Sequence, residues 1–196
     1  MKFTVEKKEI SEALSLVASV AEKRQSIPVL SNILLKAEKV GLTFIATDLE
    51  IELTFKIPKI ELDSEGETTV SARKLADLVR SVPEDTVLTF ELLESQLEIS
   101  ALKFQADFST LPVGDFPVTE ISEFEREVAL PGKELAELIE KTSFAMASQD
   151  VRYYLNGILL EVSPAQINVV ATDGHRLAWA SCKIKTDFTD EKIIIP

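Results

Sequence analysis

The chain has 196 residues, of which 45% are hydrophobic and 28% are charged, an ordinary composition for one large or two smaller globular domains. Lys and Arg number 21 against 33 Asp and Glu, so the net charge of −12 argues against indiscriminate nucleic-acid binding but allows a local basic face. The few Gly and Pro, the short apolar runs and the single cysteine, Cys182, exclude fibrous chains, membrane spans and internal disulfides, and we expect a soluble cytoplasmic protein that does not contact membranes.

The first 57 residues predict a strand, a helix and three further strands. Residues 3–5 alternate like a strand, and Ile10, Leu14 and Val17 then follow the i, i+4, i+7 spacing of a helix. Residues 33–37, 42–46 and 50–57 have the period-two apolar pattern of strands with one buried face.

The same order of elements restarts at residue 68. A short strand at 68–70 leads to Ser71, a candidate N-cap, and to an apolar helical stripe that ends before Pro83. Strands are expected at 86–92, 96–101 and 103–110, followed by a connector at 111–117. Residues 1–122 therefore predict an α+β domain made of two β-α-β-β-β halves, with helices packed on antiparallel sheet.

A repeat at an offset of 125 residues is the most informative feature of the sequence. Residues 33–35 fall on 158–160, and 46–48 fall on 171–173, without a gap. The offset also places Leu14 on Ile139, and we expect both side chains to pack against a sheet. A second domain at 123–196 would then hold the first half of the pattern only, and we expect the chain to be a piece of a longer protein.

Catalytic and metal-binding motifs are missing from the sequence, and we expect no enzyme activity, no metal and no cofactor. No nucleotide-binding loop, HExxH or CxxC is present, and one histidine and one cysteine are too few for a zinc site. Asp48 and Asp173 occupy equivalent repeat positions and are interpreted as turn residues that follow a strand.

Three clusters of side chains could nevertheless bind a ligand. Residues 149–157 contain both tyrosines, which suit either one core and one surface position or a patch that touches nucleic acid. Residues 172–177 keep the core pattern of the first copy but replace its loop by Gly-His-Arg-Leu, which suggests a function of that loop. Arg73 and Arg80 share one helix face, which is either merely solvated or able to meet phosphates.

The chain resembles the family of bacterial DNA polymerase III beta subunits, the replicative sliding clamps. The segments that carry the resemblance are 1–5, 27–32, 46–50, 71–74, 109–112, 149–157 (QDVRYYLNG) and 171–177 (ATDGHRL). The resemblance implies a DNA-clamp fold with three similar domains per protomer, of which the third is absent here and the second is truncated. It also implies a non-catalytic ring of two protomers that encircles duplex DNA and tethers the polymerase, conferring processivity.

The resemblance assigns three groups of residues. Sequence-independent contacts to DNA are implied for Arg24, Arg73, Gln149, Tyr153 and Tyr154. One half of a groove for clamp-binding peptides is implied for Arg152, Leu155, Thr172, Gly174, His175, Arg176 and Leu177. One side of the dimer interface is implied for Lys74, Lys103, Gln105 and Phe108.

The partners implied are duplex DNA, DNA polymerase III and other peptide-bearing proteins, the clamp loader, and a second copy of the full-length protein. The 196 residues alone are not expected to close the ring. Two alternatives remain open at this stage. One is an enzyme that uses Asp173, His175 and Arg176 in an enclosed pocket. The other is an interaction module that never meets DNA.

Overall fold

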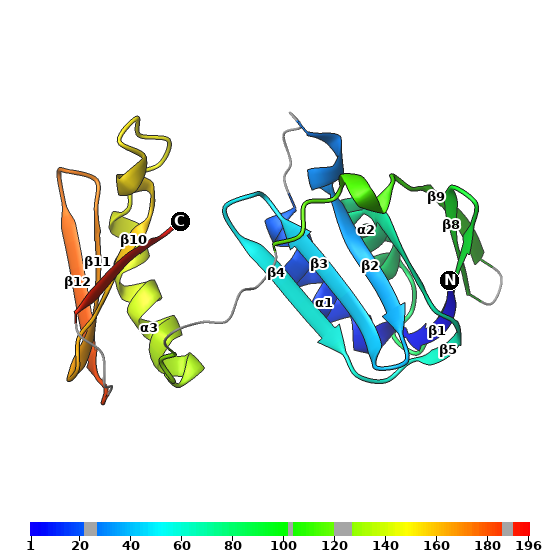
Figure 1. The fold of residues 1–196 in the computed structure, drawn as a ribbon, viewed down its shortest axis with the longest axis horizontal. Helices are drawn as coiled ribbons and strands as arrows, with labels where there is room; N and C mark the ends of the chain where they lie inside the picture. Colours follow the sequence, from blue (N-terminus) through cyan, green and yellow to red (C-terminus); the bar gives the residue numbers. More distant parts are fainter. Residues whose placement is uncertain (22–26, 102–103, 120–126, 186–189) are drawn as a thin grey trace. The chain divides into compact units, whose positions relative to one another are not determined.

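The computed structural model describes residues 1–21, 27–101, 104–119, 127–185 and 190–196. The chain divides into two compact units, unit 1 at Met1–Glu120 and unit 2 at Ile121–Pro196. Among the described residues, no helix is both long and apolar enough to cross a membrane. Both units combine helices with antiparallel sheets, which confirms the expected α+β class (Figure 1).

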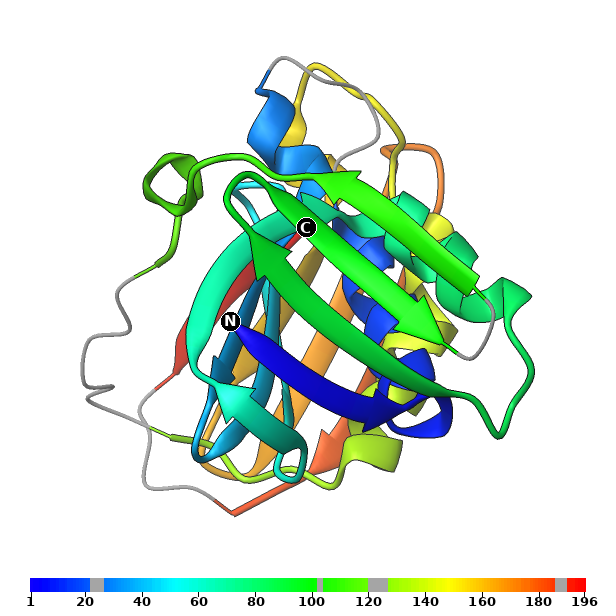
Figure 2. The ribbon, with the colours of Figure 1, turned by 90° about the vertical axis from the view of Figure 1, so that its right-hand side faces the viewer.

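Unit 1 contains two antiparallel sheets and two α-helices. Its elements are β1 (Lys2–Glu6), α1 (Lys7–Val20), η1 (Pro28–Ser31), β2 (Asn32–Glu38), β3 (Gly41–Thr47), β4 (Glu52–Ile57), β5 (Glu61–Ser64), β6 (Gly66–Ser71), α2 (Ala72–Ser81), β7 (Val87–Leu93), β8 (Gln96–Ala101), β9 (Phe104–Ser109) and η2 (Val113–Asp115). One sheet has the order β4-β3-β2-β6, and the other, whose β1, β7, β8 and β9 lie toward the viewer in Figure 2, has the order β5-β1-β7-β8-β9.

The two halves of unit 1 exchange their first strands. β1 belongs by sequence to the first half but pairs with β7 of the second, and β6 begins the second half but pairs with β2 of the first. Each half therefore completes the sheet of the other. This exchange joins both halves into one domain with a shared core.

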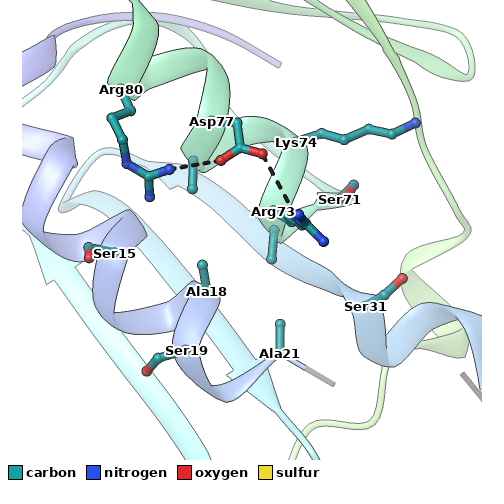
Figure 3. Close-up of a pocket in the computed structure, with 12 residues that line it drawn as sticks. Ser15, Ala18, Ser19, Ala21, Ser31, Ser71, Arg73, Lys74, Asp77 and Arg80 are labelled. Carbon is teal, nitrogen blue, oxygen red and sulfur yellow. Dashed lines mark hydrogen bonds and ion pairs between the residues drawn. The ribbon is translucent and has the colours of Figure 1, made fainter. Parts of the chain in front are cut away.

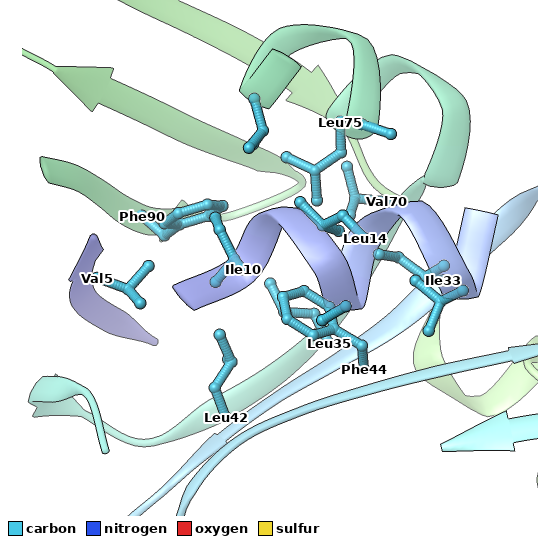
Figure 4. Close-up of a cluster of buried hydrophobic side chains, with 14 of the residues drawn as sticks. Val5, Ile10, Leu14, Ile33, Leu35, Leu42, Phe44, Val70, Leu75 and Phe90 are labelled. Atoms are coloured by element: carbon cyan, nitrogen blue, oxygen red, sulfur yellow. The ribbon is translucent and has the colours of Figure 1, made fainter. Parts of the chain in front are cut away.

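The core of unit 1 lies where both helices meet the sheets. Ile10 and Leu14 of α1 and Leu75 of α2 are almost fully buried together with Phe44 of β3 (Figure 4). The ring of Phe3 stacks on that of Phe90 at 4.7 Å across the β1–β7 ladder. The helical spacing that predicted α1 is thus explained by burial of one face against the sheet and α2.

Unit 2 contains one α-helix and one antiparallel sheet. Its elements are α3 (Gly132–Thr142), η3 (Ser143–Ala145), η4 (Tyr153–Asn156), β10 (Ile158–Val162), β11 (Gln166–Thr172), β12 (Leu177–Lys183) and β13 (Glu191–Ile195). The sheet order is β12-β11-β10-β13, and α3 packs against β11 and β12.

The offset of 125 residues holds down to the register of the strands. Ile33 pairs with Val70 in unit 1, and Ile158 pairs with Ile195 in unit 2. The shift also applies to an ion pair: Lys36–Glu67, at 3.0 Å, corresponds to Glu161–Lys192, at 2.8 Å, with the charges exchanged between the strands. The predicted repeat is therefore confirmed for this sheet.

The expectation that Leu14 and Ile139 share one environment is wrong. Leu14 is 1% exposed because α1 packs against both the sheet and α2, whereas Ile139 is 36% exposed. The described part of unit 2 has no second α-helix beside α3, so this side of α3 faces solvent. Leu138, 4% exposed, is the apolar residue of α3 in the core of unit 2, and Thr142 of the same helix is also buried.

Other local expectations also need correction. The counterpart of β1 in unit 2, at residues 128–130, is not a strand, because the strands that pair with β1 have no counterpart among the described residues. Ser71 precedes α2 but forms no side-chain cap, and β4 begins at Glu52 rather than at residue 50. The short strand β5 was not expected.

The segment expected as a connector is packed against unit 1. Phe116 is buried with Val29, Leu34 and Ile45 in a second, smaller apolar cluster. The Thr69 hydroxyl donates a hydrogen bond to the Leu111 carbonyl at 2.9 Å. Residues 111–116 therefore cover Leu34 and Ile45 of the β4-β3-β2-β6 sheet.

Candidate functional site

A groove lies between α1 and α2 of unit 1. Its volume is about 660 Å³, and it is lined by small side chains and by the hydroxyls of Ser15, Ser19, Ser31 and Ser71 (Figure 3). A smaller hollow of about 260 Å³ shares Ser15, Ala76 and Arg80 with it and so continues the groove along the two helices.

The basic side chains that line this groove belong to α2. Arg73, Lys74 and Arg80 line it, and the side chains of Arg73 and Arg80 are 89% and 69% exposed. Asp77 lies between the two arginines, with its carboxylate 3.8 Å from Arg73 Nε and 2.8 Å from Arg80 Nη1. Within a chain of net charge −12, this groove is a locally basic, hydroxyl-lined surface suited to a polyanion.

The first group of predicted residues is divided between the units. Arg73 lies in the groove of unit 1, whereas Gln149, Tyr153 and Tyr154 lie in unit 2, and Arg24 falls outside the described residues. Both tyrosines are exposed, by 83% and 51%, and their rings meet edge to face at 6.1 Å. The interpretation of one tyrosine as a core residue is therefore wrong.

The tyrosine-bearing loop of unit 2 is held by an internal hydrogen-bond network. Asp150 accepts hydrogen bonds from the backbone N–H, Nε and Nη2 of Arg152 at 2.8, 3.1 and 2.9 Å. These bonds lower the pKa of Asp150 from 3.8 to about 2. The Asn156 side chain bonds the backbone of Asp150 in both directions, at 3.0 Å each, so the loop has a defined shape.

The second predicted loop is a tight turn between β11 and β12. Asp173 Oδ1 accepts from the backbone N–H groups of His175 and Arg176, and its Oδ2 accepts from Arg176 Nε, all at 2.9 Å. The bonds from the His175 and Arg176 N–H groups contribute most to lowering the pKa of Asp173 to about 2. Gly174, at φ +87°, occupies the left-handed region that favours glycine.

The same turn occurs in unit 1, which confirms the interpretation of both aspartates as turn residues. Asp48 Oδ1 accepts from the N–H groups of Glu50 and Ile51, as Asp173 does two and three residues on. Leu49, the counterpart of Gly174, has φ +77°. The turn itself is therefore structural, and only the side chains it displays differ between the units.

The structure brings the two loops of unit 2 together. A Cβ at Gly174 would lie 3.5 Å from the guanidinium of Arg152, and Arg176 lies over the ring of Phe144 at 5.9 Å. Thr172 pairs with Leu177 in the β11–β12 ladder, and Leu177 is 66% exposed. Leu155 is half-buried and donates its N–H to the Arg152 carbonyl at 2.8 Å.

The resulting surface is open and mixed in polarity. Exposed Phe144 and Leu177 supply apolar area, while Arg152 and Arg176 supply guanidinium groups that are already paired with carboxylates. His175 is exposed on this surface. Sequence analysis missed Phe144, because an aromatic residue shortly after a helix does not by itself indicate a surface contact.

The third predicted group lies on unit 1. Gln105 and Phe108 are on β9, the edge strand of the five-stranded sheet, while Lys74 is on α2 and Lys103 is outside the described residues. Gln105 Nε2 donates to Glu98 Oε2 at 2.7 Å, and Phe108 packs partly against the core. Within the described structure β9 pairs only with β8, so its other edge can accept a further strand.

Metal binding has no support in the described part of the chain. No group of three or more His, Cys, Asp or Glu side chains converges there as a metal site would require. No buried side-chain nitrogen or oxygen among the described residues lacks a hydrogen-bond partner.

Comparison with known proteins gives matches over nearly the whole chain. Residues 1–120 match the family "DNA polymerase III beta subunit, N-terminal domain", and residues 129–196 match the central domain of the same subunit. The beta sliding clamps of Pseudomonas putida and Escherichia coli are 44% and 38% identical to the chain over its full length. The chain spans about half the length of these relatives, 54% in each case.

Solved structures give the same result. The DNA polymerase III subunit beta of Pseudomonas aeruginosa matches with a TM-score of 0.93 and 42% identity, over 100% of this chain and 54% of the other. A sliding clamp of the same species bound to griselimycin matches with a TM-score of 0.90 and 42% identity, over 100% of this chain and 53% of the other. These matches confirm the fold that the sequence motifs implied.

Proposed function

The chain belongs to the DNA polymerase III beta subunit family, and from this we propose that it forms part of a non-catalytic sliding clamp. Such a clamp encircles duplex DNA and tethers the replicative polymerase and other clamp-binding proteins, which raises processivity by keeping the enzyme at high effective concentration. Residues 1–122 would be its first domain and 123–196 part of its second. Its partners would be DNA, polymerase III, the clamp loader and a second full-length copy.

The observation that carries this proposal is the basic groove between α1 and α2. It presents guanidinium and ammonium groups and serine hydroxyls, which suit phosphate oxygens, and it lies in a chain whose net charge is strongly negative. Phosphate contacts position a protein on DNA without reading its sequence, as a sliding ring requires. Arg24, Gln149, Tyr153 and Tyr154 are proposed to add contacts of the same kind.

A measurement of salt-dependent DNA binding tests this proposal. The 196-residue chain, labelled with nitrogen-15, is titrated with a short mixed-sequence duplex at several salt concentrations and followed by NMR shifts. Each phosphate contact contributes about −0.9 to the slope of log K against log salt. The Arg73→Ala, Arg80→Ala double variant should bind more weakly with a flatter slope, and an unchanged slope would refute the groove as a phosphate site.

The loop surface of unit 2 is proposed to bind the short peptides of clamp partners. Apolar Leu177 and Leu155 would receive an apolar peptide side chain, and Arg152, His175 and Arg176 would border it. The clamp of Pseudomonas aeruginosa whose structure contains griselimycin supplies a probe for this surface. Thr172 and Gly174 would allow close approach of the peptide backbone.

Griselimycin binding to the wild-type chain is compared by calorimetry with binding to two variants. Leu177→Ala should weaken binding clearly, because exposed apolar anchors carry much of the affinity of such contacts. Ile194→Ala is the matched control, since Ile194 is about as exposed but lies on β13 at the opposite edge of the sheet. Equal losses in both variants would count against this assignment.

The proposed dimer contacts use Lys74, Lys103, Gln105 and Phe108. The open edge of β9 supports this assignment, because an edge strand can be extended by a strand of another protomer. In the full-length protein, a charged substitution at Phe108 should shift the dimer toward monomer in sedimentation measurements. A dimer of unchanged stability would remove β9 from the interface.

A further inference from the structure

The α1–α2 groove contains an acidic residue where a phosphate site would not need one. Asp77 projects from the middle of α2 between Arg73 and Arg80, as Figure 3 shows. Its Oδ1 accepts a hydrogen bond from Arg80 Nη1 at 2.8 Å, and its Oδ2 lies 3.8 Å from Arg73 Nε. One carboxylate therefore faces both guanidinium groups of the groove.

The spacing of the three residues places them on one helix face. Asp77 follows Arg73 by four positions and precedes Arg80 by three, so the side chains are neighbours on the helix surface. The Asp77 side chain is 56% exposed and is not required to neutralise a buried charge. Exposed ion pairs of this kind contribute little to stability, so stability alone does not explain the arrangement.

A phosphate that enters the groove must compete with Asp77. Both a carboxylate and a phosphate accept hydrogen bonds from the same guanidinium N–H groups, and Asp77 already occupies one such group of Arg80. The three side chains together carry a net charge of only +1. Lys74, in contrast, forms no ion pair with any described residue.

We propose that Asp77 weakens the phosphate contacts of Arg73 and Arg80 and so makes the groove release the DNA backbone readily. This inference rests on the proposed function, because it assumes that the groove meets phosphates. A ring that slides must exchange each phosphate for the next, and an internal competitor lowers the free energy lost when a contact breaks. Asp77 thus lowers the affinity of the groove for DNA and thereby favours mobility along it.

A positioning role for Asp77 predicts the opposite change in DNA affinity. If Asp77 served to orient the two arginines toward DNA, its removal would loosen them and weaken binding. If it competes with phosphate, its removal frees both guanidinium groups and strengthens binding. The sign of the change therefore distinguishes competition from positioning.

The test compares Asp77→Asn with Asp63→Asn in the 196-residue chain. Asp63 is an exposed residue of β5 that does not line the groove, so its replacement changes the net charge equally. Binding of a short mixed-sequence duplex is measured by NMR titration at several salt concentrations. Circular dichroism of each variant checks that α2 is intact.

Asp77→Asn should bind the duplex about two- to five-fold more tightly than Asp63→Asn, the factor that corresponds to one exposed ion pair. The slope of log K against log salt should steepen by about 0.9 for each additional phosphate contact. Asp77→Ala should behave alike, which excludes an effect of the new amide. Binding that is equal to or weaker than that of Asp63→Asn would overturn the inference.

The Arg73→Ala, Arg80→Ala double variant distinguishes a failure of this inference from a failure of the proposed phosphate site. If that variant binds DNA as well as wild type, the groove is not a phosphate site and both ideas fail. If it binds more weakly while Asp77→Asn is not strengthened, only the role of Asp77 is refuted. If no variant binds even at the lowest salt, both are refuted for this chain.

Discussion

Replacing the side chain at one repeat position by alanine should lower the stability of the two units by very different amounts. Leu14 and Ile139 are separated by 125 residues and lie on corresponding helix faces. Leu14 is enclosed by its sheet and by α2, while Ile139 is one-third exposed on α3, beside which the described part of unit 2 has no second α-helix. We therefore expect Leu14→Ala to destabilise unit 1 severely and Ile139→Ala to have a small effect on unit 2.

The magnitudes follow from burial. Leu→Ala removes three carbon groups worth about 0.8 kcal/mol each, and the cavity left at Leu14 raises the loss to about 3–4 kcal/mol. Ile139 loses the same number of carbons, but its exposed side leaves no cavity, so about 1 kcal/mol is expected. Leu138→Ala is the matched control, because Leu138 is 4% exposed and should cost unit 2 about 3 kcal/mol.

Urea denaturation with two probes measures the units separately. Trp179, the only tryptophan of the chain, lies on β12 and reports unit 2 by fluorescence. Hydrogen exchange of the β2 and β3 amides reports unit 1. If Ile139→Ala lowers the stability of unit 2 as much as Leu138→Ala does, then this side of α3 is covered and the reasoning is wrong.

Two further predictions concern pH and the packed connector. The pKa of Asp150 and of Asp173 is about 2 in the folded chain against 3.8 unperturbed. The stability that these two carboxylates add to unit 2 is therefore complete above pH 3.8 and is lost as the pH falls toward 2. Carbon-13 NMR titration of the carboxyl groups checks this, and midpoints near 3.8 would contradict it. Phe116→Ala should destabilise unit 1 by about 3 kcal/mol, whereas Phe144→Ala, at an exposed site, should change the stability of unit 2 little. Thermal melts compare the two variants, and similar shifts of the melting temperature would disprove the packing role of Phe116.

Much of the candidate site could be found from local sequence. The turns at Asp48 and Asp173 follow from a short acceptor side chain that bonds the backbone two and three residues on, which is a local property. The sequence singled out the two tyrosines as candidate site residues but left their exposure open. Phe144 could not be assigned, because its contact with Arg176 joins segments 32 residues apart.

The position of Asp77 in the groove could not be predicted from the sequence for the same reason. Its spacing from Arg73 and Arg80 is visible in the sequence, yet the sequence alone does not show that all three line one groove. The groove exists because α1 and α2 lie side by side, and that contact joins residues about 60 positions apart. Tertiary packing therefore decided which surface charges act together.

The sequence by itself determined the repeat, the order of the elements and the register of the β3–β4 and β11–β12 strand pairs. Alternating apolar residues and the Asp-bearing turns that join these strands specify the register, because a shift of one residue would turn every core side chain toward solvent. Only the tertiary structure decided the exchange of β1 and β6 between halves and the exposure of Ile139. Both depend on which distant strand or helix is available as a neighbour, and a local pattern of hydrophobic residues does not specify that neighbour.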